Sequence, residues 1–203
     1  MSSSSDTSSD QGKKSVRYKI VKEMFDTELS YMKQLLLAEH CYIEPVLKLK
    51  VLEPEEEKNL TKLKLKKLIN EDKILLEKLR KLIGENKWDD EYSCIGKMFL
   101  ESFKEEFISI YSNYVSNYGQ LINWLSELNK NNSVHPFLIF LKKTVPNAEN
   151  FTLPSLLITP VQRIPRYILL LKVFHLLFNF QFAFFKNLFR FLLEIWNYSS
   201  LLN

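Results

Sequence analysis

Hydrophobic residues recur every three or four positions along most of this chain, which is the spacing of amphipathic helices. The first such stretch runs from about Val16 to Ile43, and we expect it to end at Pro45 because an interior proline removes a backbone hydrogen bond. Its apolar stripe consists of Val21, Met24, Phe25, Tyr31, Met32, Leu35 and Leu36. A second stretch of leucines begins at Pro54, which is followed by acids that favour a helix start, and continues to Gly84.

The most regular pattern lies between Ile95 and Leu128 and predicts one long helix. Its apolar side is rich in aromatic residues at helical spacing, among them Phe99, Phe103, Phe107 and Tyr111. Such a stripe is typical of a protein core, so we expect these rings to be buried.

One acid interrupts the first apolar stripe. Glu28 falls between Leu35 and Val21 in helical angle. An unpaired carboxylate is costly to bury, so Glu28 is expected either to form an internal ion pair or to be held ready for an external partner.

Residues 156–172 form an apolar run that contains Pro160 and Pro165. Each interior proline costs a helix roughly 3 kcal/mol, so neighbouring elements must hold a bend in place if the run is helical. Gln162 and Arg166 are four residues apart and therefore share one face near the bend. Residue spacing alone favours the simpler alternative, a kinked core helix whose basic residues are solvated.

Composition narrows the fold class. The 203 residues include only 4 glycines, with 46% hydrophobic and 26% charged residues, which fits one all-α globular domain. The net charge of +4 is too small to indicate a nucleic-acid partner. The lysines at 58, 62, 64, 66 and 67 indicate a solvated face or, as the alternative, contact with an anionic membrane surface.

The sequence lacks the motifs of several enzyme classes. It has no glycine-rich phosphate loop and no nucleophile signature, so we expect no cofactor and no small-molecule substrate. Its 3 histidines and 2 cysteines have no metal-ligand spacing, so we expect no metal, and reduced thiols are the default for so few cysteines.

Three segments resemble conserved regions of the Dbl-homology domain, the module of guanine-nucleotide exchange factors for Rho-family GTPases. Thr159–Tyr167 (TPVQRIPRY) resembles the third region nearly letter for letter, and Glu23–Leu35 resembles the first, with its Thr-Glu followed after two residues by Tyr. Ile95-Gly96 and Tyr111–Tyr118 resemble the second region. The resemblance implies an elongated helical bundle, a Rho/Rac/Cdc42-type GTPase as partner, and a cytoplasmic location with possible recruitment to the plasma membrane.

The same resemblance implies roles for individual residues. Glu28 would engage the first switch of the GTPase, and Arg166 would engage the second switch with support from Gln162, whereas Arg163 and Tyr167 would belong to the core. The alternative function is a helical module that binds a GTPase or a membrane without releasing nucleotide.

The two ends depart from this pattern. Residues 1–15 are serine-rich and polar, which predicts a disordered tail, and residues 16–172 form the expected Dbl-homology domain, without its last helix. Residues 173–203 begin with a Phe/Leu-rich stretch that does not resemble the family. We interpret that stretch as translated intron, and the further domain that usually follows in the family, a pleckstrin-homology domain, is not found.

Overall fold

The computed structural model describes residues 15–50, 52–84, 95–128, 130 and 150–178, with isolated positions at 136, 138–140, 143, 190 and 193. Its elements are α1 (Val16–Ala38), the π-helix η1 (Glu39–Ile43), α2 (Glu44–Lys48), α3 (Pro54–Lys62), α4 (Leu65–Ile83), α5 (Ile95–Ser102), α6 (Glu105–Leu128), α8 (Leu153–Leu157) and α9 (Thr159–Phe178). This part of the chain contains helices and no strand, which confirms the all-α prediction.

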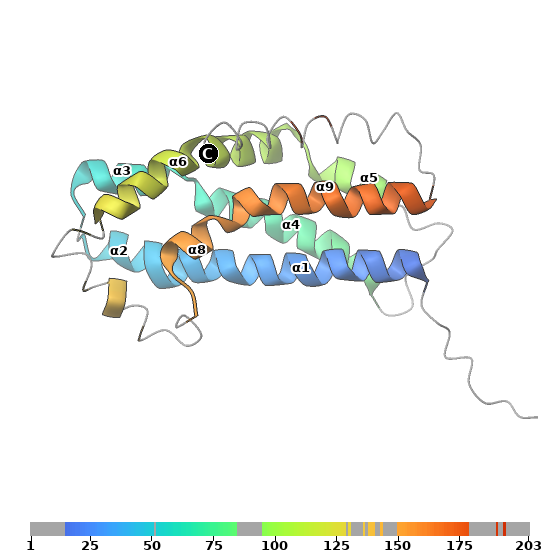
Figure 1. Cartoon of the computed structure of the whole chain (residues 1–203), viewed down its shortest axis with the longest axis horizontal. Helices are drawn as coiled ribbons and strands as arrows, with labels where there is room; N and C mark the ends of the chain where they lie inside the picture. Colours follow the sequence, from blue (N-terminus) through green and yellow to red (C-terminus); the bar gives the residue numbers. More distant parts are fainter. Residues whose placement is uncertain are drawn as a thin grey trace, which may run out of the picture.

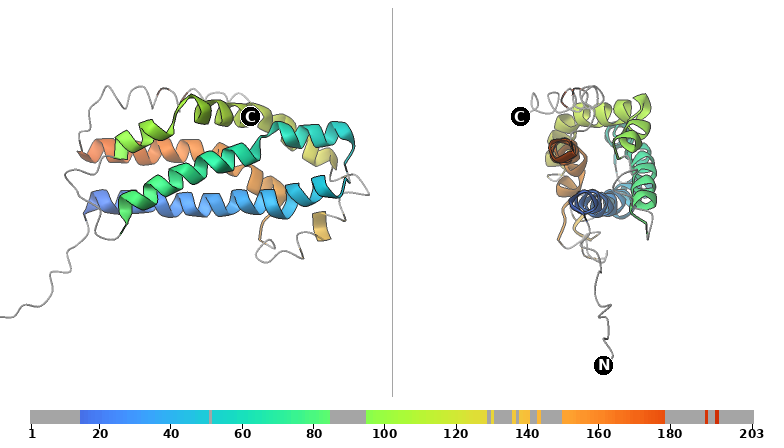
Figure 2. Two further views of the ribbon diagram at one scale, coloured as in Figure 1. Left: turned by 180° about the vertical axis from the view of Figure 1, so that it is seen from behind. Right: turned by 90° about the vertical axis from the view of Figure 1, so that its right-hand side faces the viewer.

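The long helices form an elongated bundle (Figure 1). Viewed along its length, α1, α4, α6 and α9 surround one core, with α4 and α9 on opposite sides (Figure 2, right). The contacts agree with this view, because α1 and α6 each pack against both α4 and α9. The predicted aromatic core is confirmed: Phe99, Phe103, Phe107 and Tyr111 are all buried.

The first helix begins where the side chain of Ser15 accepts a hydrogen bond from the Tyr18 backbone N–H, at 3.1 Å. The prediction that this helix ends at Pro45 is wrong. The chain passes through the π-helix η1 and continues as α2, with Pro45 in its first turn. A proline is tolerated there because the first turn of a helix needs no donor from it, and the wider π turn absorbs the change in register.

Two other predicted helices are each divided. The stretch from Pro54 to Gly84 breaks at Lys64, whose φ of 50° lies in the left-handed region, and so forms α3 and α4. The stretch from Ile95 to Leu128 breaks between α5 and α6, at Phe103 and Lys104. Periodicity missed both breaks because Leu63 and Phe103, which lie beside them, are buried like their neighbours in the stripe.

The proline segment is helical: it includes the end of the short helix α8 and most of the long helix α9. Pro154 lies in the first turn of α8 and Pro160 in the first turn of α9, so only Pro165 stands inside a helix. The corner between them is held by Thr159, whose hydroxyl donates to the Leu156 carbonyl at 2.7 Å.

The predictions for the chain ends concern residues mostly outside this description. Residues 1–14 and most of 179–203 are not described, so the disordered tail and the translated intron stay predictions. Val173–Phe178 are described and continue α9.

Candidate functional site

A hollow of about 320 Å³ lies between α1 and α9. We call it the α1–α9 groove, and its lining residues are Thr27, Ser30, Tyr31 and Gln34 from α1 and Thr159, Gln162, Arg163 and Arg166 from α9. Hydroxyl, amide and guanidinium groups dominate this lining, and it contains no carboxylate. The groove is therefore suited to hydrogen-bonding a partner's polar or acidic groups.

An ion pair lies beneath the groove. Arg163 Nη2 and Nε donate to Glu28 Oε2 at 2.5 and 3.1 Å, and the Tyr167 hydroxyl lies 2.9 and 2.8 Å from Glu28 Oε1 and Oε2. Glu28 is 0% exposed, Arg163 3% and Tyr167 2%. The assignment of Arg163 and Tyr167 to the core is thus confirmed.

This geometry corrects the expectation that Glu28 presents its carboxylate to a GTPase. Both carboxylate oxygens are engaged inside the bundle, and no part of the side chain reaches the surface. Of the two outcomes that the apolar stripe allowed, the structure contains the internal pair. Its physical basis is that an unpaired buried carboxylate would be strongly destabilising.

A second buried acid extends the polar interior. Asp72 of α4 is 0% exposed, and its Oδ1 accepts a hydrogen bond from the Tyr111 hydroxyl at 2.9 Å. The Tyr31 hydroxyl lies 3.0 Å from that of Tyr111, which links the groove floor to Asp72. Sequence reasoning missed Asp72, although it interrupts the leucines of α4 as Glu28 interrupts α1, and the same argument would have found it.

The pKa values of both buried acids, Glu28 and Asp72, are raised, and both acids interact with the same cation, Arg163. Burial, followed by the charge of Glu28, raises the pKa of Asp72 well above its ordinary value. Burial also raises the pKa of Glu28, and the Arg163 guanidinium and the Tyr167 hydroxyl oppose that rise. Arg163 contacts Glu28 directly, and this contact opposes the rise of the Glu28 pKa.

The other two predicted site residues are placed as expected from their spacing. Gln162 and Arg166 are both exposed and both line the α1–α9 groove, one turn apart on α9. Arg166 forms no ion pair with any residue that the structure describes. Its charge is therefore available to a partner.

An exposed acid that sequence reasoning overlooked lies in line with this groove. Glu23 is exposed and stands four, seven and eleven residues before the lining residues Thr27, Ser30 and Gln34. That spacing places it on the same face of α1, one turn beyond the groove. The overlooked signal is its position off the apolar stripe, because a carboxylate outside the stripe reaches solvent without a burial cost.

The described residues hold no group of three or more His, Cys, Asp or Glu side chains that could bind a metal ion. None of the described helices has the length and apolar character required to cross a membrane.

Comparison with known proteins finds curated relatives that align with this chain over only a small part of their own length. The chain is 31% identical over 166 residues to a Dictyostelium discoideum protein named guanine exchange factor for Rac 30, and 38% identical over 89 residues to the mouse Rho guanine nucleotide exchange factor 10-like protein. These alignments cover 77% and 42% of this chain but only 9% and 7% of the relatives, so the chain spans less than a tenth of their length.

The fold matches solved structures. The DH domain of FARP2 superposes with a TM-score of 0.77 at 16% identity, covering 94% of this chain and 91% of that one. The DH/PH fragment of PDZRHOGEF, solved in complex with human RhoA, gives a TM-score of 0.77 at 22% identity, covering 92% of this chain and 53% of that one.

A family model described as the RhoGEF domain matches residues 20–176, which include the whole α1–α9 groove. This chain belongs to the RhoGEF domain family.

Proposed function

We propose that this chain promotes release of GDP from a Rho-family small GTPase, which binds at the α1–α9 groove. The observation that carries this proposal is the pair of exposed side chains Gln162 and Arg166, which lie above the buried Glu28–Arg163 ion pair. Membership of the RhoGEF domain family and the solved complexes of related folds with RhoA support the choice of partner.

Exchange of this kind needs no covalent chemistry from the chain. A protein that binds the nucleotide-free GTPase more tightly than the GDP-bound form must weaken GDP binding by the same factor. What the chain must supply is a firm surface that holds the GTPase switches in the open arrangement. In this proposal Arg166, with Gln162 beside it on the groove, holds one switch.

The acid that the proposal assigns to the other switch is Glu23 instead of Glu28. Glu23 is exposed and lies on the α1 face that continues into the groove, whereas Glu28 is enclosed. The proposed surface thus has an acid, Glu23, on α1 and a cation, Arg166, on α9. Two opposite charges at separate positions favour one orientation of a partner with complementary charges.

The test is the rate of fluorescent GDP release from a panel of Rho-, Rac- and Cdc42-type GTPases incubated with the full chain. We expect acceleration of at least one GTPase, and a loss of about tenfold or more in the Glu23→Ala variant. Glu77→Ala is the matched control, because Glu77 is an exposed acid on α4, across the bundle from α9.

Binding of a GTPase without any acceleration would decide for the non-catalytic interaction module. An equal loss of rate in the Glu77→Ala control would show that the groove is not the site.

A further inference from the structure

The outward side of α4 carries a concentration of positive charge that the proposed exchange function does not use. α4 contains six lysine and arginine residues against three acids, and one of those acids is the buried Asp72. Five of the cations are exposed, and we call them, together with Ile74, the α4 basic face: Lys66, Lys67, Lys73, Arg80 and Lys81. Glu77 is the one fully exposed acid among them.

Most of these cations lack the ion pair that some of the described lysines outside α4 form. Lys22, Lys48, Lys58 and Lys130 each form an ion pair with an acid three or four residues away. On the α4 basic face, Lys66 contacts Glu39 at 3.5 Å, and the other four cations form no ion pair with any residue that the structure describes. Their charge is therefore directed to solvent and is not neutralised within the protein.

An apolar side chain stands in the middle of this charge. Ile74 is 48% exposed, and it lies seven residues after Lys67 and seven before Lys81. Residues seven apart lie on the same side of a helix, so the three side chains form a line roughly 21 Å long.

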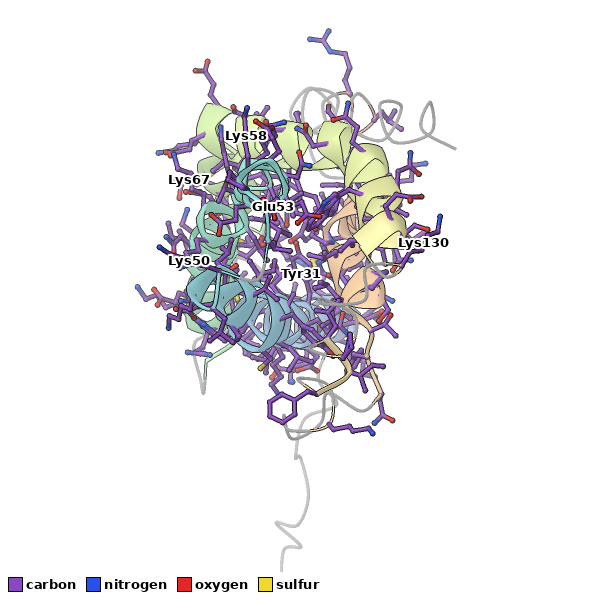
Figure 3. The ribbon with its side chains drawn as sticks, turned by 90° about the vertical axis from the view of Figure 1, so that its left-hand side faces the viewer. Tyr31, Lys50, Glu53, Lys58, Lys67 and Lys130 are labelled. Carbon is purple, nitrogen blue, oxygen red and sulfur yellow. The ribbon has the colours of Figure 1, made fainter. Side chains whose placement is uncertain are left out.

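The α4 basic face points away from the α1–α9 groove. The end-on view of Figure 2 (right) shows α4 and α9 on opposite sides of the bundle. The end-on view of Figure 3 shows Lys67 on the same side as Lys58 of α3 and Lys50, with Lys130 across the bundle. A ligand on the α4 basic face would therefore leave the groove open.

We infer that the α4 basic face binds the surface of an anionic lipid bilayer. Lysine side chains that flank an exposed aliphatic residue fit such a surface, because the ammonium groups reach the lipid phosphates while the isoleucine enters the boundary of the acyl chains. Nucleic acid is a weaker match, since the face has one arginine, no aromatic side chain for stacking, and an apolar group where phosphates would lie.

This inference stands apart from the proposed exchange function, since it uses no residue of the groove. The helix lies flat on the surface and does not insert, because the polar residues around Ile74 exclude deeper burial.

The test is co-sedimentation of the full chain with vesicles of phosphatidylcholine alone or mixed with phosphatidylserine. We expect binding to the mixed vesicles only, weakening as salt is raised. Removing a cation near such a surface weakens binding about fivefold, so Lys67→Glu/Lys81→Glu should weaken it about 30-fold or more.

The matched control is Lys104→Glu/Lys130→Glu, which makes the same change of charge at exposed positions outside α4. It should retain binding within about threefold if the effect is local. A third variant, Ile74→Ser, keeps every charge and should weaken binding by about threefold to tenfold through loss of the apolar contact.

Equal loss in both double variants would overturn the inference, because the attraction would then follow net charge alone. Equal binding to neutral vesicles, or binding to a DNA duplex but not to the mixed vesicles, would also overturn it. Circular dichroism of each variant separates loss of binding from loss of fold.

Discussion

Arg163 and Arg166 stand three residues apart on α9 and belong to two different environments. Arg163 is 3% exposed and is held by Glu28 and Tyr167, whereas Arg166 is exposed at the groove and has no described ionic partner. Arg163 donates hydrogen bonds to Glu28 inside the bundle. Arg166 exposes its guanidinium group to solvent at the groove. The difference teaches that one short motif can supply both a buried ion pair and the exposed groove residues above it.

The largest expected effect comes from removing the interior arginine. Arg163→Met should lower the free energy of unfolding by about 3–5 kcal/mol, because Glu28 is left as an uncompensated buried charge. Urea unfolding followed by circular dichroism measures this loss.

Adding Glu28→Gln to Arg163→Met should recover part of that stability, since no buried charge then remains unpaired. A double variant that is less stable than Arg163→Met alone would contradict the assignment of the pair.

Removing the surface arginine, Arg166, should lower the exchange rate and leave the stability of the fold nearly unchanged. Arg166→Ala should slow GDP release about 30-fold, as for a residue that carries much of an interface, while the free energy of unfolding changes by less than about 0.5 kcal/mol. Exchange assays and urea unfolding on the same preparation give both numbers. If Arg166→Ala unfolds the chain, the distinction between the two arginines fails.

A smaller effect concerns the second buried acid and the pH. The pKa of Asp72 is raised in the folded state, so its ionisation opposes folding, and stability should fall as pH rises above about 4, the ordinary value for an aspartate. Asp72→Asn cannot ionise and should reduce this fall.

Urea midpoints at several pH values test the point, with Glu77→Gln as an exposed control on the same helix. Parallel pH profiles for the wild type and Asp72→Asn would mean that Asp72 does not titrate as its burial implies.

The smallest effect is expected at Gln162. Gln162→Ala removes a neutral hydrogen-bonding group from the groove, and such bonds contribute about 0.5–1.5 kcal/mol, so exchange should slow by roughly twofold to tenfold with stability unchanged. A loss larger than that of Arg166→Ala would reverse the order of the two groove residues.

The sequence was sufficient for the helical class, the aromatic core and the placement of Gln162 and Arg166. Each of these depends on local spacing, which helical geometry converts directly into a face. The same spacing could not distinguish a buried pair from an exposed acid at Glu28, because the deciding partner, Arg163, lies 135 residues away.

The element boundaries were harder to predict for a related reason. The bend at Lys64 and the π-helix before Pro45 leave the apolar pattern intact, so they are visible only once neighbouring helices are placed. Long-range packing can hold a residue in a backbone conformation that its own propensity disfavours.

Two tyrosine hydroxyls form hydrogen bonds at the two ends of the segment that contains the short helix α8. The Tyr42 hydroxyl donates to the Phe151 carbonyl at 3.2 Å, and the Tyr114 hydroxyl donates to the Leu157 carbonyl at 2.7 Å. These phenols come from separate parts of the bundle, so the segment before α9 cannot open locally without disturbing η1 and α6. Amide hydrogens of residues 153–162 should therefore exchange with solvent only during unfolding of most of the bundle. Under a load applied at the groove, the segment from Phe151 to Leu157, which leads into α9, would resist displacement because both of its ends are tied to the bundle.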